Sequence, residues 1–184
     1  MKKLLVIVMV LVFAAASVLV LPAQEEKKKA EPKPSQEQYT PPKPLDNAMM
    51  KYLVGEWEGS MESPMGTSAE FLRYWIGLDG QFLFMEGASK AGNMKYSGIG
   101  AMTISPNTGN VMGYWIDNFR GMYHGDGKIE GNKCAMEWTG TMGRSKRIIE
   151  KIDENKLSIT VIMDGPDGRE QSLKGEMTRK KTDK

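Results

Sequence analysis

The sequence has one cysteine, Cys134, and one histidine, His124, in 184 residues. A single cysteine excludes an intramolecular disulfide, so stability must come from packing. Zinc sites need three or four closely placed nitrogen, sulfur or oxygen ligands, and one histidine and one cysteine ten residues apart do not supply them. The G-x-S-x-G motif of serine hydrolases is also absent. The sequence therefore predicts no metal site, no resident cofactor, no catalytic set and no enzymatic activity.

Charge is nearly absent from the first part of the chain. Lys2 and Lys3 precede an uncharged apolar run, LLVIVMVLVFAAASVLVLPA, at residues 4–23. This layout is typical of a secretory signal peptide, with cleavage expected after Ala23. The run could also span about 30 Å of hydrocarbon as an uncleaved inner-membrane anchor. We therefore expect residues 1–23 to direct export, to the periplasm or outside the cell.

Residues 24–44 hold five of the nine prolines and nine charged residues. Such a segment buries too little apolar surface to order itself, which predicts a disordered linker. Residues 45–184 then form one domain. Of the 25 basic and 23 acidic residues, seven and four precede Leu45, which leaves 18 and 19 in the domain. A near-neutral domain lacks the basic footprint of a nucleic-acid-binding protein.

Glycine-rich and Asn- or Asp-rich turn signals recur every eight to twelve residues after one short predicted helix. The helix is expected over residues 45–52, with Asp46 as its cap. Even spacing of short aromatic and β-branched runs predicts about ten hairpin-linked antiparallel strands, closed into an up-and-down barrel. The Gly125-Asp126-Gly127 triplet is expected to be a turn. The strands are expected near 54–61, 69–78, 81–88, 94–104, 110–117, 119–124, 128–130 continuing through 133–140, 145–152, 156–163 and 169–179.

Both faces of several predicted strands are apolar. In 69–78, Arg73 and Trp75 share one face with Phe71, while Leu72, Tyr74 and Ile76 share the other. A barrel strand that lines a cavity on one side and is covered on the other would show this pattern.

Four segments resemble the bacterial family catalogued as domain of unknown function 1579. They are LVGEWEGSMESPMG (53–66), LRYWIGLDGQFLFMEG (72–87), YSGIGAMTISPNTGNVMGYWIDN (96–118) and DGPDGREQSLKGEMTRK (164–180). The resemblance covers residues 45–181 in order. It implies a calycin-like, ten-stranded antiparallel barrel, related in shape to nitrobindin and fatty-acid-binding proteins, with a small-ligand cavity. It implies no reaction.

The segment Gly55-Glu56-Trp57-Glu58-Gly59 resembles the first-strand signature of calycins. The resemblance implies that Trp57 plugs one end of the barrel in a structural role. Arg179 or Arg147 would then stack on its indole.

Haem and copper binding are weaker alternatives. Nitrobindin-like barrels bind haem through a histidine on a late strand, whereas strands 145–152, 156–163 and 169–179 contain none. His124 is expected at an exposed strand end. Thirteen of the 15 methionines lie in the domain but are spread along the strands, which favours core or pocket lining over a copper(I) site.

The leading hypothesis is non-enzymatic binding of a small apolar or amphiphilic ligand in the barrel. An acidic head group would suit Arg73, Arg147 and Tyr123, with Trp75 and Trp115 as aromatic walls. The alternative is a structural or assembly protein of the cell envelope. It would use outward-facing Leu72, Tyr74 and Ile76, for example to form a homodimer.

Overall fold

The computed structural model describes residues 41–64, 66–165 and 168–181. The predicted signal segment at 1–23 and residues 24–40 of the predicted linker lie outside the described residues. Residues 41–44 belong to neither a helix nor a strand, and the carbonyl oxygen of Pro42 accepts a 2.7 Å hydrogen bond from the Gln81 side chain. In the described part of the chain, no helix has the length and apolar character needed to cross a membrane.

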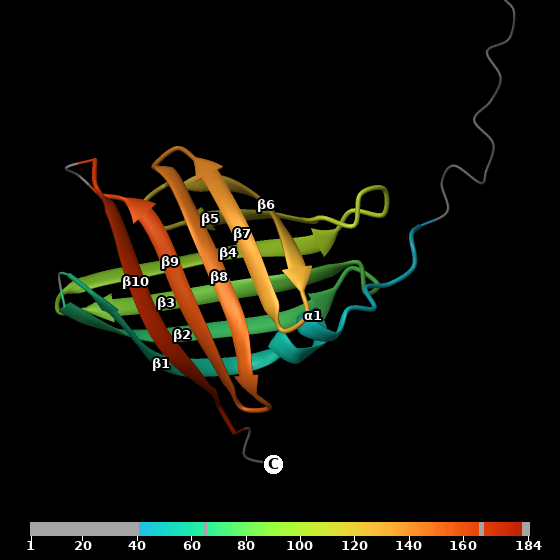
Figure 1. The fold of residues 1–184 in the computed structure, drawn as a ribbon, viewed down its shortest axis with the longest axis horizontal. Helices are drawn as coiled ribbons and strands as arrows, with labels where there is room; N and C mark the ends of the chain where they lie inside the picture. Colours follow the sequence, from blue (N-terminus) through green and yellow to red (C-terminus); the bar gives the residue numbers. More distant parts are fainter. Residues whose placement is uncertain (1–40, 65, 166–167, 182–184) are drawn as a thin grey trace, which may run out of the picture. The chain divides into compact units, whose positions relative to one another are not determined.

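Ten antiparallel strands follow one short helix and close into a barrel (Figure 1). Each strand pairs with its neighbours in the chain, and the first strand pairs with the last. This confirms the predicted all-β, up-and-down, calycin-like architecture with a short N-terminal helix. The elements are α1 (Ala48–Leu53), β1 (Gly55–Ser63), β2 (Gly66–Gly77), β3 (Phe82–Ala91), β4 (Met94–Ile104), β5 (Val111–Asp117), β6 (Met122–Glu130), β7 (Lys133–Gly140), β8 (Gly143–Asp153), β9 (Lys156–Asp164) and β10 (Glu170–Arg179).

The N-terminal cap of α1 differs from the expectation. Asn47, and not Asp46, caps the helix, because its side chain accepts a 3.1 Å hydrogen bond from the amide of Met50. Asp46 pairs instead with the ammonium group of Lys51 at 2.6 Å.

The predicted turn at Gly125-Asp126-Gly127 is wrong, because β6 runs through it without a break. A Cβ atom at Gly125 would lie 2.8 Å from the Trp138 indole. Glycine is therefore needed here to make room for a ring inside the barrel and not to turn the chain. The turn comes at Gly131, which has a φ of +59°.

The inner and outer faces of β2 are the reverse of those that the ligand hypothesis assumed. Leu72 and Tyr74 are buried inside the barrel, whereas Arg73 and Trp75 lie on its outer wall. The predicted outer interface of Leu72, Tyr74 and Ile76 is thus wrong for its first two residues. Alternation separates the two faces, but it does not identify the inner one when both are apolar.

The helix closes one end of the barrel (Figure 1). Met49, Met50 and Leu53 are buried against the core. The Tyr52 hydroxyl donates a 2.6 Å hydrogen bond to the carbonyl of Lys156, which anchors the helix to the start of β9. The turns that join β1 to β2 and β3 to β4 lie at the other end, at the left of Figure 1. We call this the open end.

Candidate functional site

An arginine from β8 reaches into the barrel interior. Arg147 pairs in register with Met136 of β7 and Val161 of β9. It shares a small void with Tyr74 of β2 and with residues of β3 and β4, which lie across the barrel from β8 in the strand order. The void has a volume of about 10 Å³, room for about one water molecule. The lining residues are Tyr74, Met85, Met102, Cys134, Met136, Trp138, Arg147 and Ile149.

The guanidinium of Arg147 is incompletely paired. Its Nε atom is buried and has no hydrogen-bond partner among the described residues. No carboxylate in the described part of the chain forms an ion pair with it. A buried polar group without a partner costs stability, and a buried charge costs more. Arg147 is therefore a cation held in place without a counterion from the described residues.

The groups around Arg147 provide no compensating negative charge. Burial raises the pKa of the Tyr74 hydroxyl, against the opposing effect of Arg147. Burial also raises the pKa of the Cys134 thiol to about 11, again opposed by Arg147. Both groups are neutral near pH 7, so Arg147 carries the sole charge among the eight described residues that line the void.

Three methionines give the void a deformable wall. Met85, Met102 and Met136 are buried around it. Methionine has a flexible, polarisable side chain that repacks easily. A ligand larger than a water molecule could therefore enter if these side chains moved aside.

Aromatic side chains lie between the void and the open end. Trp115 faces the interior, and its Nε1 donates a 2.6 Å hydrogen bond to the hydroxyl of Tyr96. Tyr96 in turn stacks on Phe119, with ring centroids 6.2 Å apart. Tyr123 is the register partner of Trp115 and packs against the core. Burial is the main cause that raises the pKa of Tyr96 to about 12.

The five predicted ligand-binding residues thus fall into two groups. Trp115, Tyr123 and Arg147 are brought together in the interior. Arg73 and Trp75 are not, because both lie on the outer wall. There the Arg73 guanidinium lies 5.4 Å from the Trp75 ring centroid and 3.8 Å from the Glu86 carboxylate.

A polar cluster inside the open end was missed in the sequence. The carboxylate of Glu70 accepts hydrogen bonds from Ser68 at 2.5 Å and from Ser89 at 2.6 Å. Ser68 and Glu70 share a strand face with Leu72 and Tyr74, so the inner face of β2 changes from polar to apolar towards the helix. In the sequence, this change from polar to apolar residues at the even-numbered positions of β2 was the signal that could have revealed the cluster.

Trp57 lies at the closed end of the barrel. It is fully buried, and its Nε1 donates a 2.8 Å hydrogen bond to the carbonyl of Leu53. Arg179 stacks on the indole at 4.1 Å. Its two terminal nitrogens donate to the carbonyls of Val54 at 2.6 Å and Tyr52 at 2.7 Å. Of the two arginines considered as the stacking partner, Arg179 occupies that position and Arg147 does not.

His124 is the third residue of β6, which continues for six residues beyond it, and is therefore not followed by a turn. It is exposed on the outer wall, between Tyr114 of β5 and Thr139 of β7. Among the described residues, no group of three or more His, Cys, Asp or Glu side chains is placed to hold a metal ion.

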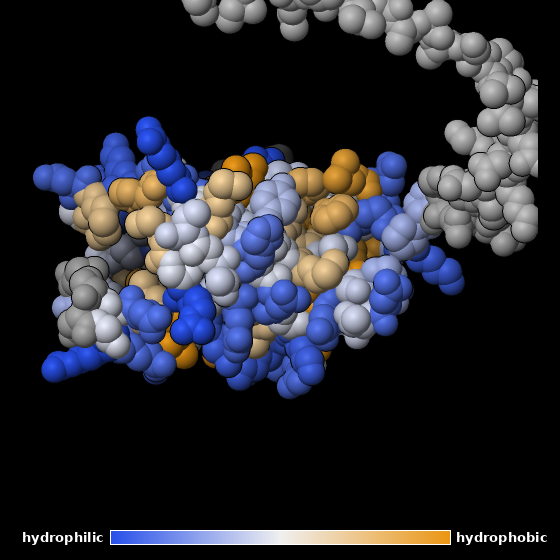
Figure 2. Space-filling model, turned by 90° about the horizontal axis from the view of Figure 1, so that it is seen from above, coloured by the Kyte–Doolittle hydropathy of each residue, from blue (hydrophilic) through white to orange (hydrophobic). Residues whose placement is uncertain are grey.

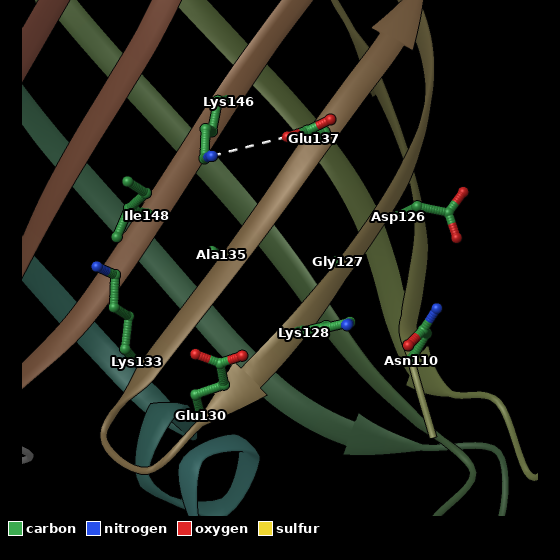
Figure 3. Close-up of a pocket in the computed structure, with 10 residues that line it drawn as sticks. All are labelled: Asn110, Asp126, Gly127, Lys128, Glu130, Lys133, Ala135, Glu137, Lys146 and Ile148. Carbon is green, nitrogen blue, oxygen red and sulfur yellow. Dashed lines mark ion pairs between the residues drawn. The ribbon is translucent and has the colours of Figure 1, made fainter. Parts of the chain in front are cut away.

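A larger hollow of about 490 Å³ lies on the outer wall over β6, β7 and β8 (Figure 3). Its lysines and carboxylates are mixed, and Lys146 pairs with Glu137 at 3.7 Å. Since it is open and its charges are balanced, it does not select one class of ligand as clearly as the interior does.

Solved structures of similar fold include two natural barrels. Rv2717c from M. tuberculosis is 16% identical with a TM-score of 0.58, covering 72% of this chain and 95% of that chain. The S-type phycobiliprotein lyase CPES from Guillardia theta is 9% identical with a TM-score of 0.55, covering 73% and 92%. At these identities the likeness shows the fold alone.

Comparison with curated proteins gave no match. The family model described as "Protein of unknown function (DUF1579)" matches residues 44–179. This range spans the helix and all ten strands of the barrel. The chain therefore belongs to the DUF1579 family.

Proposed function

We propose that the barrel binds, without converting it, a small amphiphilic molecule with an acidic head group. The observation that carries the proposal is the buried Arg147 Nε without a partner. A carboxylate or similar anion would accept hydrogen bonds from the guanidinium and neutralise its charge. Hydrogen bonds between two charged groups are about twice as strong as neutral ones, and arginine can donate two in parallel to a carboxylate.

The interior around Arg147 suits an apolar body behind that head group. Val161 and Leu173 are register partners on β9 and β10, and both pack against the core. Together with Trp115, these two residues form an apolar part of the inner wall between Arg147 and the open end. Figure 2 shows apolar side chains between hydrophilic ones at that end, on the left of the view. The head group would enter first, and Met85 and Met136 would move to admit it.

Titration of the purified full chain with dodecanoate, followed by tryptophan fluorescence, tests the proposal. Arg147→Met is expected to weaken binding by about tenfold or more, because the anion loses its charged partner. The variant should fold, since an apolar side chain of similar length replaces a half-buried arginine whose Nε has no partner among the described residues. Arg144→Met is the matched control, because Arg144 lies on the same strand but is exposed. An unliganded wild type, or equal affinity in Arg147→Met, would overturn the proposal.

We also propose that the protein works outside the cytoplasm. Two lysines followed by the apolar run at 4–23 support this. Cell fractionation with N-terminal sequencing of the recovered protein tests it. A chain that starts at Gln24 in the exported fraction is the expected result, and an intact chain in the cytoplasm would contradict it.

A further inference from the structure

Three turns at the open end are joined to one another by hydrogen bonds. They connect β3 to β4, β5 to β6 and β7 to β8, and they lie at the same end because alternate turns of an up-and-down barrel do. The Asn118 side chain accepts from the amide of Ser97 at 3.0 Å and donates to the carbonyl of Lys95 at 3.2 Å. On the other side, Met122 and Thr141 exchange two hydrogen bonds of 3.1 and 3.2 Å. The three turns therefore form one continuous part of the rim, which we call the rim patch. It comprises residues 90–95, 117–122 and 140–144.

Each turn of the rim patch exposes a large apolar side chain. The exposed fractions are 54% for Met94, 52% for Phe119, 64% for Met122 and 68% for Met142. Phe119 is held in place by stacking on Tyr96. Single exposed apolar residues are ordinary, but a group of them on joined turns marks an interaction surface.

The exposed charges of the rim patch are all positive. They belong to Lys90, Lys95, Arg120 and Arg144. None of the four forms an ion pair with a carboxylate of the described residues. The one acidic residue of the patch, Asp117, is half-buried, and its Oδ1 accepts hydrogen bonds from the amides of Phe119 at 2.9 Å and Gly121 at 2.8 Å. Its carboxylate therefore shapes the turn and does not neutralise the exposed cations.

Arg120 occupies the tip of its turn in a backbone conformation that favours glycine. Its φ is +64°, in the left-handed region that residues with a side chain adopt at a cost in strain. The turn thus presents a cation where glycine would be less strained.

The remaining part of the same rim has the opposite charge balance. In the turns that join β1 to β2 and β9 to β10, the charged residues that the structure describes are Glu62, Asp164, Arg169 and Glu170. Three of these are acidic and one is basic. An anionic surface is therefore attracted to the rim patch and repelled by the rest of the rim, which gives the barrel a defined orientation on it.

We propose that the rim patch docks on an anionic lipid surface. Its methionines and Phe119 would enter the boundary between head groups and acyl chains, while the cations beside them would contact lipid phosphates. A nucleic acid would use the cations but leave the apolar tips in water, whereas an anionic bilayer accommodates both. Docking would place the open end of the barrel at the membrane. The proposal does not depend on whether the interior holds a ligand.

A polarity-sensitive dye attached at Met142→Cys of the full chain tests the docking. Because the apolar run at 4–23 can itself enter a bilayer, the readout is the emission of the dye at one turn and not total vesicle binding. The native Cys134 is buried and should not be labelled. We expect a blue shift with vesicles of phosphatidylglycerol and phosphatidylcholine, and a shift at least about fivefold smaller with phosphatidylcholine alone. High salt should reverse the shift, because it screens the attraction.

A charge variant of the labelled chain separates the rim patch from a general effect of positive charge. Lys95→Gln/Arg120→Gln/Arg144→Gln should weaken docking by about tenfold or more, because each lysine or arginine beside an anionic surface adds to the attraction. The matched control removes three exposed cations near the closed end and should dock as the wild type does. It is Lys128→Gln/Lys133→Gln/Lys156→Gln.

A second label position checks the orientation. Glu150 is exposed on β8 and pairs in register with Lys133, near the closed end, so a dye at Glu150→Cys should show no shift. Equal shifts at the two positions, equal docking of the charge variant and its control, or no preference for anionic vesicles would overturn the proposal. A shift that grows with protein concentration in the absence of vesicles would indicate a second copy as the occupant and would also overturn it.

Discussion

Cys134 is a residue whose ionisation is changed by burial in the barrel. Its side chain is buried on β7 beside the Arg147 void. Burial raises the pKa of the thiol from 9.0 to about 11, although Arg147 acts in the opposite direction. A neutral, enclosed thiol is a poor nucleophile and packs as a small apolar residue.

This shift predicts a stability change at alkaline pH. Below pH 9 the thiol is protonated in both states, and its contribution to stability is fully present. Between about pH 9 and 11 the unfolded chain releases the proton while the folded chain keeps it, so the free energy of unfolding falls by about 3 kcal/mol in total. Urea denaturation of the wild type and Cys134→Ala at several pH values measures it. The stability difference between them should change across that window, and a constant difference would contradict the assignment.

At the scale of elements, the helix and the first and last strands form one closing unit. Arg179 of β10 stacks on Trp57 of β1 and donates hydrogen bonds to the carbonyls of Tyr52 and Val54, at the end of α1. These carbonyls lie where the helix leaves backbone acceptors without internal partners. One side chain thus links the two strands that close the barrel to the helix that covers its end.

Arg179→Ala should accordingly destabilise the barrel by about 2 kcal/mol, because it removes the stacking contact and leaves two carbonyl oxygens without their donor. Lys174→Ala, on the exposed face of the same strand, should change stability by less than about 0.5 kcal/mol. Urea denaturation of both variants measures the difference. Equal stabilities would show that the closing unit does not depend on Arg179.

Glycines inside the strands explain why the turn predicted at Gly125-Asp126-Gly127 was wrong. A Cβ atom at Gly98 would lie 2.4 Å from the Trp115 indole, and one at Gly125 would lie 2.8 Å from that of Trp138. Both indoles pack against bare backbone of the wall. A glycine that accommodates a ring from another strand looks in sequence like a glycine that turns the chain, and only the folded barrel separates the two.

For the molecule as a whole, the regular turn spacing was enough to predict ten strands and a closed barrel. It could not identify the inner face, because the outer wall over β2 to β6 is also apolar. Arg73 and Arg147 therefore looked equivalent in sequence, each on a strand with apolar neighbours. The structure separates them, with Arg73 exposed beside Glu86 and Arg147 reaching into the core without a counterion among the described residues.

The most direct test of anion binding by Arg147 compares two ligands of equal length, dodecanoate and dodecanol, in the wild type and in Arg147→Met. The two ligands share an apolar body and differ in the charge of the head group, so their affinity ratio isolates the contribution of the interior cation. We expect the wild type to prefer the acid by about tenfold or more and Arg147→Met to abolish this preference. A wild type that does not distinguish acid from alcohol, or a preference that persists in Arg147→Met, would contradict it.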